Sequence, residues 1–248
     1  MRKAIRKDEI LELVGRYNYV TVEFLAKTLH ISPSSIRRDL AVMENQKLIE
    51  RSHGGVRAID YNNALTPYEL RMQENSIVKR EICRKAINLV NDGDTIFIDG
   101  STTCLYLPDL LETKNNITVL TNSLKLAAMF ERSKNITVYC TGGHLRLSEL
   151  VATGSVAENT CKFMHTNIMF FSARAIDKNG VITDINEPET SIRKIALGNT
   201  DKAVFLCDST KFEQSSVFEV CRADDTAYIV TEKTPGNYAQ KWKTNLIV

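Results

Sequence analysis

Small polar residues follow four short apolar runs of this chain, and their chemistry suits the binding of an anion or a sugar. The four segments are Asp99-Gly100-Ser101-Thr102-Thr103, Thr121-Asn122-Ser123, Thr141-Gly142-Gly143 and Asp208-Ser209-Thr210-Lys211. In the first segment, Gly100 would let backbone N–H groups approach an anion, and a following helix would point its positive end at the site. Lys211 could supply a formal positive charge. The Asp99 carboxylate suits sugar hydroxyls better than a phosphate.

These four segments would meet if the runs before them are parallel strands, because open α/β sheets bind ligands beyond the carboxyl ends of their strands. Each segment alone is best read as an ordinary strand-to-helix turn capped by Ser or Thr. Four of them at one edge favour a small polyhydroxylated or phosphorylated ligand. Neither GxxxxGK[ST] nor GxGxxG is present, so we expect no ATP or dinucleotide cofactor.

A second group of residues, near the N-terminus, has the types and spacing of a helix that reads DNA. Ser32 followed by Pro33 predicts a helix start, because the hydroxyl accepts a backbone N–H bond and proline fits the first helical position. Ile36, Leu40 and Met43 then recur at helical spacing. This apolar stripe leaves exposed the residues that we expect to contact phosphates and base edges in a major groove: Ser32, Ser34, Ser35, Arg37 and Arg38.

The neighbouring segments predict a winged helix-turn-helix around this helix. A first helix is expected over residues 8–17, and Phe24, Leu25 and Leu29 mark the apolar face of a second. Short strands at 48–52 and 56–59 flank two glycines that permit a tight hairpin. The DNA-binding residues expected on or near this wing are Arg51, His53 and Arg57.

Two alternatives accompany this interpretation. The arginine pair could belong to the solvated face of an ordinary helical hairpin, and His53 could be a polar turn residue instead of a phosphate contact. The capped helix start, the preceding helix and the basic hairpin together favour DNA binding.

Composition is that of a soluble globular protein, with 43% hydrophobic and 25% charged residues in 248. The six cysteines are scattered without a CxxC pair, which indicates reduced thiols in a cytoplasm and no zinc or other metal site. No apolar run approaches the length of a membrane span, and no signal peptide is expected. Residues 1–58 hold 11 Lys and Arg against 7 Asp and Glu, so the predicted DNA-binding head is the basic part of the chain.

The predicted fold class is α/β, with a small N-terminal winged helix-turn-helix joined to a larger doubly wound, mostly parallel sensor domain. Polar residues with Pro67 predict a linker at 60–67, between a DNA-binding domain at 1–59 and an effector-sensing and oligomerisation domain at 68–248. The larger domain is expected to begin with a helix over 68–90. Its strands are expected at 95–99, 117–121, 136–140, 167–171, 203–208 and 227–231.

The chain resembles the DeoR family of bacterial transcriptional regulators, which repress sugar-utilisation operons. The head carries IxxxxxRRDLxxxExxxLIxRxHGG, and the body carries NDGDTIFIDGSTT, ITVLTNS, TGGxLR, the glycine at Gly154, and CDSTKF. The resemblance implies a body similar to ribose-5-phosphate isomerase that binds a phosphorylated sugar. It implies phosphate contacts for Gly100, Ser101, Thr102 and Thr103, and pocket roles for Asn122 and Lys211.

We therefore expect a cytoplasmic homo-oligomeric repressor without a cofactor, which binds an operator and is released by a phosphorylated sugar. The expected effector-binding residues are Asp99, Gly100, Ser101, Thr102, Thr103, Asn122, Gly142, Gly143 and Lys211. One alternative is an isomerase-like enzyme with an attached DNA-binding head. Arg174 and Ala175 stand where the isomerase pattern has acids, and arginine cannot act as the base of an enediol mechanism. A third hypothesis makes the body a pure dimerisation domain.

Overall fold

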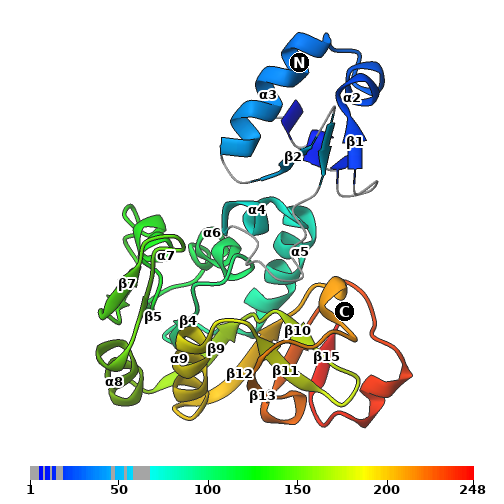
Figure 1. Ribbon diagram of the computed structural model, residues 1–248. Coiled ribbons are helices and arrows are strands. Elements are labelled where there is room, and N and C mark those ends of the chain that lie inside the picture. The colour runs from blue at the N-terminus through cyan, green and yellow to red at the C-terminus, as the bar shows by residue number, and fades with distance from the viewer. Residues whose placement is uncertain are drawn as a thin grey trace. The chain divides into compact units, whose positions relative to one another are not determined.

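The computed structural model describes residues 6–7, 9–11, 13–14, 19–45, 48–52, 55–57 and 68–248. The chain forms two compact units, residues 1–71 and 72–248 (Figure 1). The predicted linker at 60–67 lies outside the described residues. The domain limits drawn from the sequence therefore stay a prediction.

The N-terminal unit is a small helical domain with a three-stranded antiparallel sheet. The described residues between 6 and 14 are helical, and the later elements are β1 (Tyr19–Thr21), α2 (Val22–Thr28), α3 (Pro33–Asn45), β2 (Glu50–Ser52) and β3 (Gly55–Arg57). The strand order is β1-β3-β2, so β3 pairs with both neighbours. This is the winged helix-turn-helix arrangement that the sequence predicts.

The core of this unit contains the predicted apolar stripe and differs from the prediction at one helix. Ile36, Leu40 and Met43 of α3 are buried with Leu25 of α2. Phe24 was expected on the same buried face, but its side chain is 39% exposed. Two further differences are that β1 was not predicted and that β2 begins at Glu50, two residues after the predicted start. β3 begins at Gly55, and the predicted end of the second wing strand, at 58–59, lies outside the described residues.

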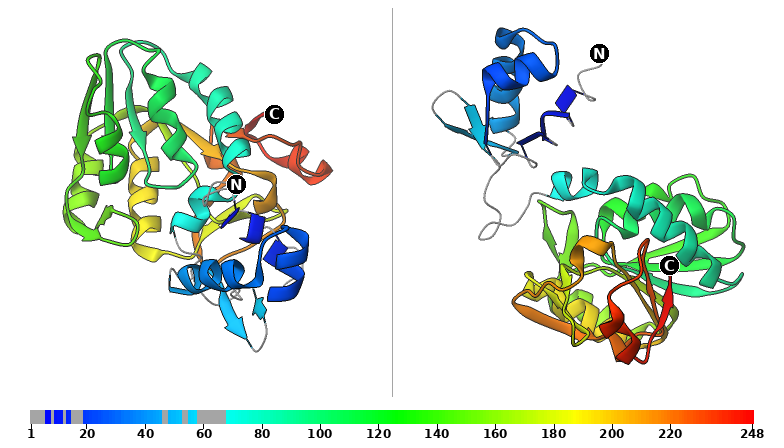
Figure 2. Two further views of the ribbon diagram at one scale, coloured as in Figure 1. Left: turned by 90° about the horizontal axis from the view of Figure 1, so that it is seen from above. Right: turned by 90° about the vertical axis from the view of Figure 1, so that its right-hand side faces the viewer.

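The second unit is built on a seven-stranded parallel sheet in the order β15-β14-β12-β9-β4-β5-β6. Its strands are β4 (Thr95–Ile98), β5 (Ile117–Thr121), β6 (Ile136–Cys140), β9 (Thr166–Phe171), β12 (Thr200–Leu206), β14 (Tyr228–Val230) and β15 (Asn245–Ile247). The sheet confirms all six predicted strands and adds β15. The edge strands β15 and β6 lie at opposite ends of the sheet (Figure 2).

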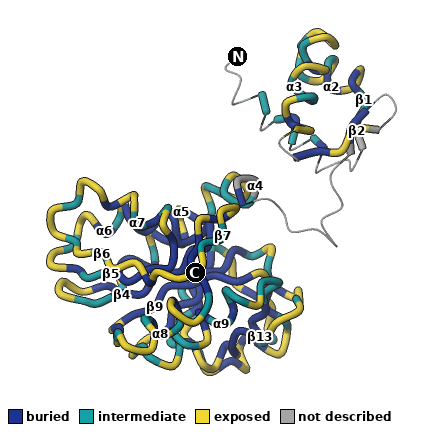
Figure 3. Tube along the Cα trace, turned by 60° about the vertical axis from the view of Figure 1, so that its left-hand side comes forward, coloured by how far each residue is buried: buried dark blue, intermediate teal, exposed yellow. Residues whose placement is uncertain are grey.

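Helices cover both faces of this sheet, and Figure 3 shows how completely its central strands are buried. The helices are α4 (Tyr68–Gln73), α5 (Ser76–Ala86), α6 (Leu107–Leu111), α7 (Leu124–Met129), α8 (Ser155–Phe163) and α9 (Glu187–Leu197). In the view of Figure 1, α5, α6 and α7 lie above the sheet, with α8 and α9 below it. The smaller strands are β7 (His144–Arg146), β8 (Val151–Thr153), β10 (Ala175–Ile176), β11 (Val181–Asp184) and β13 (Phe218–Arg222).

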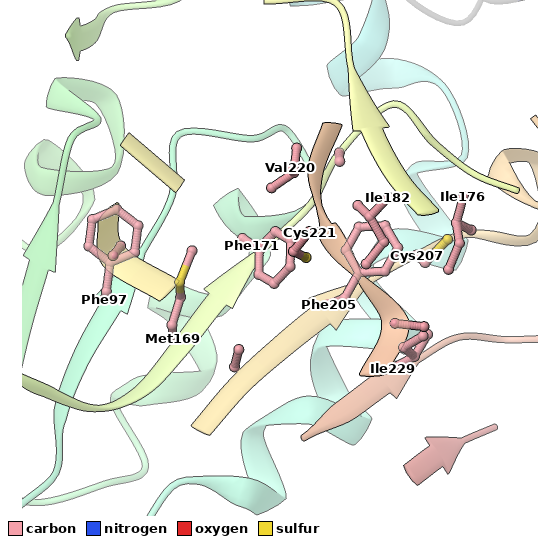
Figure 4. Packing of buried hydrophobic residues seen from close by; sticks show 14 of the residues in the cluster. Phe97, Met169, Phe171, Ile176, Ile182, Phe205, Cys207, Val220, Cys221 and Ile229 are labelled. Carbon is pink, nitrogen blue, oxygen red and sulfur yellow. The ribbon is translucent and has the colours of Figure 1, made fainter. Parts of the chain in front are cut away.

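The larger hydrophobic core lies between the sheet and the layer formed by α9, β11 and β13 (Figure 4). Phe171 of β9 and Phe205 of β12 place their ring centroids 5.2 Å apart there. Ile182 of β11 and Val220 of β13 pack against these strands from the other side. Burial of these side chains is the main contribution to the stability of the unit, and it fixes the strand ends that carry the polar segments.

The predicted helix over 68–90 is wrong in its continuity. The chain forms α4 and then α5, with Asn75 between them in the left-handed region at φ 53°. Asparagine tolerates this conformation better than most residues. Its amide also donates to Asp208 Oδ1 at 3.4 Å, a tertiary contact that periodicity does not reveal.

Candidate functional site

The polar segments at the carboxyl ends of the strands lie where the strand order reverses. From β4 the chain proceeds to β5 and β6 on one side, then returns to β9 on the other side of β4. Open α/β sheets bind ligands at such a reversal. The backbone N–H of Asp99 donates to Phe170 O at 3.1 Å, which joins the ends of β4 and β9 there. We call the residues gathered at this edge the strand-end site: Lys79, Asp99–Thr103, Asn122, Ser172, Asp208 and Lys211.

The Asp99 carboxylate is held on both of its oxygens. Oδ2 accepts a hydrogen bond from Arg193 Nε at 2.7 Å, and Oδ1 accepts one from the backbone N–H of Ser101 at 3.1 Å. Asp99 therefore orients the polar segment after β4. Its predicted contact with sugar hydroxyls stays a prediction.

Arg193 of α9 is the centre of a buried charge cluster that sequence reasoning missed. Besides Asp99, its guanidinium donates to Asp184 Oδ2 at 2.9 Å and to Glu189 Oε2 at 3.3 Å. Burial of Arg193 disfavours its charge, but attraction by these three carboxylates outweighs burial and raises the pKa of the guanidinium. Arg193 therefore stays charged and holds α9 against the end of β4.

Lys79 of α5 is a second residue that sequence reasoning missed. Only 4% exposed, it donates from Nζ to Thr102 Oγ1 at 3.2 Å. The sequence carries one signal for this position. Lys79 lies three, four and seven residues before Ile82, Cys83 and Ala86, all buried, so a lysine occupies the apolar stripe of the helix. A buried ammonium beside a hydroxyl segment is a cationic partner for an anion.

Lys211 lies at the ends of β9 and β12, as expected from the sequence. Its Nζ donates to Ser172 Oγ at 2.7 Å and lies 3.6 Å from Asp208 Oδ2. Burial alone would raise the pKa of Asp208, but Lys211, the Thr210 hydroxyl and Lys79 lower it. Both lysines therefore attract the Asp208 carboxylate, and their Nζ atoms donate to hydroxyls of residues that follow β4 and β9.

Asn122 and Gly100 fix the segment after β4 to its neighbour after β5. The backbone N–H of Gly100 donates to Asn122 Oδ1 at 3.1 Å, and Asn122 Nδ2 donates to Ala152 O at 3.4 Å. A Cβ atom at position 100 would lie 2.5 Å from Val151 Cγ2. Glycine is therefore required here by the close approach of β8.

One expectation about these segments is not met. Residues Cys104–Tyr106 form a single 3-10 turn after the segment, not the α-helix start that was expected to point at an anion. Gly142 and Gly143 are exposed in the turn after β6, with φ 67° and 113°, and their predicted contact with an effector stays a prediction. Pro108 lies in the first turn of the five-residue helix α6, where its missing N–H leaves no helical hydrogen bond unmade.

The Thr103 side chain has no hydrogen-bond partner among the described residues. Its hydroxyl is buried. Buried hydroxyls are normally hydrogen-bonded, so an acceptor from a ligand would satisfy this group. A shallow cavity of about 380 Å³ lies elsewhere, between α9 and β13, and shares no residue with the strand-end site.

The predicted DNA-reading residues lie at the start of α3, where Ser35 is half-buried and the other four are exposed. Ser32 precedes the first helical residue, and its Oγ lies 3.1 Å from Ser34 Oγ and donates to Ser35 Oγ at 3.0 Å. Arg37 pairs loosely with Glu23 at 3.6 Å, with both side chains more than half exposed. Arg38 is exposed on the same helix. Their contacts with DNA stay a prediction.

The wing is described only in part. Arg51 lies in β2 and pairs with Glu44 at 3.8 Å, with both side chains solvent-accessible. His53 lies outside the described residues, and for Arg57 only the backbone, paired in β3, is described. Among the described residues, no cluster of His, Cys, Asp or Glu has the arrangement of a metal site, and no helix is long and apolar enough to cross a membrane.

Comparison with known families places both units. Residues 6–62 match the family described as "DeoR-like helix-turn-helix domain", and residues 74–233 match "DeoR C terminal sensor domain". The chain belongs to the DeoR family of helix-turn-helix transcriptional regulators. This membership places it among regulators, not among enzymes.

Curated relatives match along nearly the whole chain. The "Uncharacterized HTH-type transcriptional regulator YulB" of Bacillus subtilis is 30% identical over 94% of this chain and 90% of its own length. The "Glycerol-3-phosphate regulon repressor" of Haemophilus influenzae is 27% identical over 100% and 98%. The "Lactose phosphotransferase system repressor" of Staphylococcus aureus is 28% identical over 100% and 99%.

Among solved structures, the chain is similar to ribose 5-phosphate isomerase A from Methanocaldococcus jannaschii. The identity is 17%, the TM-score is 0.40, and the similarity covers 56% of this chain and 55% of that one. The same enzyme from Neisseria gonorrhoeae gives 18% and a TM-score of 0.39, over 55% and 53%.

Proposed function

We propose that this regulator represses a carbohydrate-utilisation operon and that a phosphorylated sugar, bound at the strand-end site, releases it from the operator. The observation that carries the proposal is the convergence of Lys79 and Lys211 on the loops that end β4, β9 and β12. Two ammonium groups, the hydroxyls of residues 101–103 and backbone N–H groups make up the donor set that phosphate recognition uses.

The sugar part of the ligand is supported by neighbouring side chains and by the relatives. Ser172, Asn122 and Asp208 line the same strand ends and offer hydroxyl, amide and carboxylate groups that suit sugar hydroxyls. Regulators named for glycerol-3-phosphate, L-fucose and lactose phosphotransferase systems are among the similar proteins. Carbohydrate sensing is therefore the function that fits both the side chains of the strand-end site and the names of the similar regulators.

A path from the strand-end site to the start of the sensor unit runs through α4. Asp208, which the two lysines attract, accepts a hydrogen bond from Asn75 directly after α4. Met72 of α4 accepts a hydrogen bond from Tyr106 on its carbonyl oxygen at 3.3 Å. A phosphate that draws Lys79 and Lys211 away from Asp208 would change these contacts. Ligand binding can alter operator affinity only through such differential contacts in two states.

The proposal also covers the oligomeric state of the regulator, its cellular location and its contacts with DNA. The regulator acts in the cytoplasm as a homo-oligomer, whose paired heads bind repeated or palindromic half-sites. The head contacts phosphates through Ser32, Ser34 and Ser35 and base edges through Arg37 or Arg38. Arg51, His53 and Arg57 of the wing contact the backbone of the duplex.

The test is operator binding by fluorescence anisotropy at fixed salt, with and without a panel of triose, pentose and hexose phosphates. We expect one member to weaken binding by the full-length wild type at least about tenfold, a coupling of about 1.4 kcal/mol. Ser101→Glu places an anion in the phosphate position, so it should bind the operator normally but not respond. Ser215→Glu, on an exposed loop, is the control that should respond like wild type. Normal release of the Ser101→Glu variant would contradict the proposed site.

A further inference from the structure

Exposed apolar side chains gather around the edge strand β6. Of thirteen large hydrophobic side chains exposed in the described residues, seven lie between residues 124 and 163. Phe163 is 94% exposed and Leu147 is 77% exposed, the values of side chains that nothing in the described part of the chain covers. We call the seven side chains the apolar belt: Leu124, Met129, Tyr139, Leu147, Leu150, Val156 and Phe163.

The belt surrounds β6 on both faces of the sheet. α7, which carries Leu124 and Met129, packs against β5 and β6. α8 belongs to the opposite face, where its Ala157 joins the core with Phe97. The Thr160 hydroxyl of α8 donates to Thr141 O, just beyond β6, at 2.9 Å. Figure 3 shows the chain exposed around β6 and along α8. Residues of the belt therefore lie on both faces of the sheet beside β6.

The apolar area of the belt is close to what a stable dimer needs from each subunit. With about 200 Å² for a fully exposed large side chain, the seven exposures amount to roughly 700–800 Å². A standard specific interface buries about 800 Å² per partner. Monomers rarely expose a contiguous apolar patch of this size.

β6 itself lacks the features that keep edge strands from pairing with other chains. Its five residues, Ile136–Cys140, include no charge and no proline. Asn135 O accepts from Ile117 N–H and Thr141 N–H donates to Thr121 O, so the odd-numbered residues face β5. Since N–H and C=O groups alternate sides along a strand, the backbone groups of Ile136, Val138 and Cys140 point outward.

We infer that a second copy of this chain docks on the apolar belt and pairs its β6 antiparallel with this one, about a two-fold axis beside Val138. The inference rests on the proposed function in one respect, since that function requires a homo-oligomer. Pairing about Val138 would place Ile136 opposite the partner's Cys140 and form about three hydrogen-bonded residue pairs. It would join two seven-stranded sheets and cover both belts, because a two-fold interface uses the same surface twice.

The oligomeric mass of the full chain tests whether a second copy docks on the apolar belt. Wild type at 10 µM should sediment as a dimer or a multiple of it. A variant carrying Leu147→Glu and Phe163→Glu should dissociate at least about 100-fold more readily, because two carboxylates would be desolvated in an apolar interface. The matched control carries Ile77→Glu and Val217→Glu, at side chains 82% and 71% exposed outside the belt. Wild-type mass in the belt variant, or a monomeric wild type, would overturn the inference.

Disulfide trapping tests the strand pairing separately. Cys140 is exposed, whereas the other five cysteines are buried. Ile136→Cys should therefore form a disulfide with the partner's Cys140 under copper phenanthroline and give a reducible band at twice the chain mass, since residues so paired lie about 5.5 Å apart. Thr137→Cys, whose side chain points to the opposite face, is the control and should not. Equal cross-linking of both variants, or of neither, would overturn the antiparallel pairing.

Failure of the proposed function would look different. If the strand-end site binds no sugar phosphate, wild type and the belt variant would both show no thermal shift with the panel, while the difference in mass persists. If only the docking inference fails, sugar phosphates would still stabilise both proteins, and the two would have the same mass.

Discussion

Replacing Arg193 by methionine should lower the free energy of unfolding of the sensor unit by about 3 kcal/mol or more. Arg193 is 4% exposed and donates to three carboxylates at 2.7, 2.9 and 3.3 Å. Breaking a buried ion pair by removing one partner typically costs about 3–5 kcal/mol, because charge of one sign stays uncompensated. The side chains of Asp184 and Glu189 are 13% and 12% exposed, so water can relieve part of the cost. We therefore expect the lower end of that range.

The assay is urea unfolding of the full chain followed by circular dichroism, with thermal melting in parallel. A loss of about 3 kcal/mol corresponds to a drop of about 6–12 °C in Tm for a unit of this size. Lys194→Met, the next residue on α9 and exposed, is the matched control and should stay within about 0.5 kcal/mol of wild type. A loss below about 1 kcal/mol for Arg193→Met would refute the role of Arg193 as the charge that orients Asp99 and holds α9 at the strand-end site.

Three further perturbations test other parts of the structure. Gly100→Ala should destabilise by about 1–3 kcal/mol in urea unfolding, because its Cβ would lie 2.5 Å from Val151 Cγ2; Val151→Ala should restore part of the loss, and purely additive effects would contradict the close approach. The pKa of Asp208 is lower in the folded state than in the unfolded state, where it is about 3.9. The ionised carboxylate therefore stabilises the fold above about pH 3.9, and this stabilisation is lost as the pH falls through the lower folded pKa. The urea midpoint of Asp208→Asn should therefore lie below wild type at pH 7 and approach it near pH 3; a constant difference would contradict the ionic role. Arg38→Ala should weaken operator binding by about 1–3 kcal/mol if it reads a base, whereas Arg132→Ala, at a side chain 94% exposed, should not; equal affinities would remove Arg38 from the recognition surface.

The sheet could be predicted because its strands are short runs that are apolar on both faces, a pattern that few other structures produce. Those runs place residues 99–103 and Lys211 at one edge without further information. β15 was missed because three residues, Asn245–Ile247, are too few to show a pattern. The break at Asn75 was missed because apolar periodicity continues across it, and only the fold brings Asp208 to its amide.

The charged residues of the site show why sequence alone reaches part of it. Lys79 and Arg193 each stand beside a second basic residue on a helix, where most basic residues are solvated. Lys79 and Arg193 differ from solvated basic residues because they lie on the buried face of their helices. Which face is buried depends on how each helix packs. A charged residue at a stripe position of an amphipathic helix is a signal that a sequence can carry, and Lys79 has it. Glu189 lies four residues before Arg193 on α9, a spacing that the sequence shows, but Asp99 and Asp184 come from other elements, so their approach to Arg193 follows only from the tertiary fold.

The central claim is that the strand-end site binds a sugar phosphate. Calorimetric titration of the full chain tests it most directly, with phosphorylated sugars, their unphosphorylated parents and the variant Lys79→Met for comparison. The account predicts that one sugar phosphate binds wild type and that its parent sugar does not. Loss of one charge-assisted contact of about 1.5–3 kcal/mol should weaken binding to Lys79→Met about 10- to 100-fold. Equal affinity of wild type and Lys79→Met for that sugar phosphate, or equal binding of the parent sugar, would contradict a phosphate position between Lys79 and Lys211.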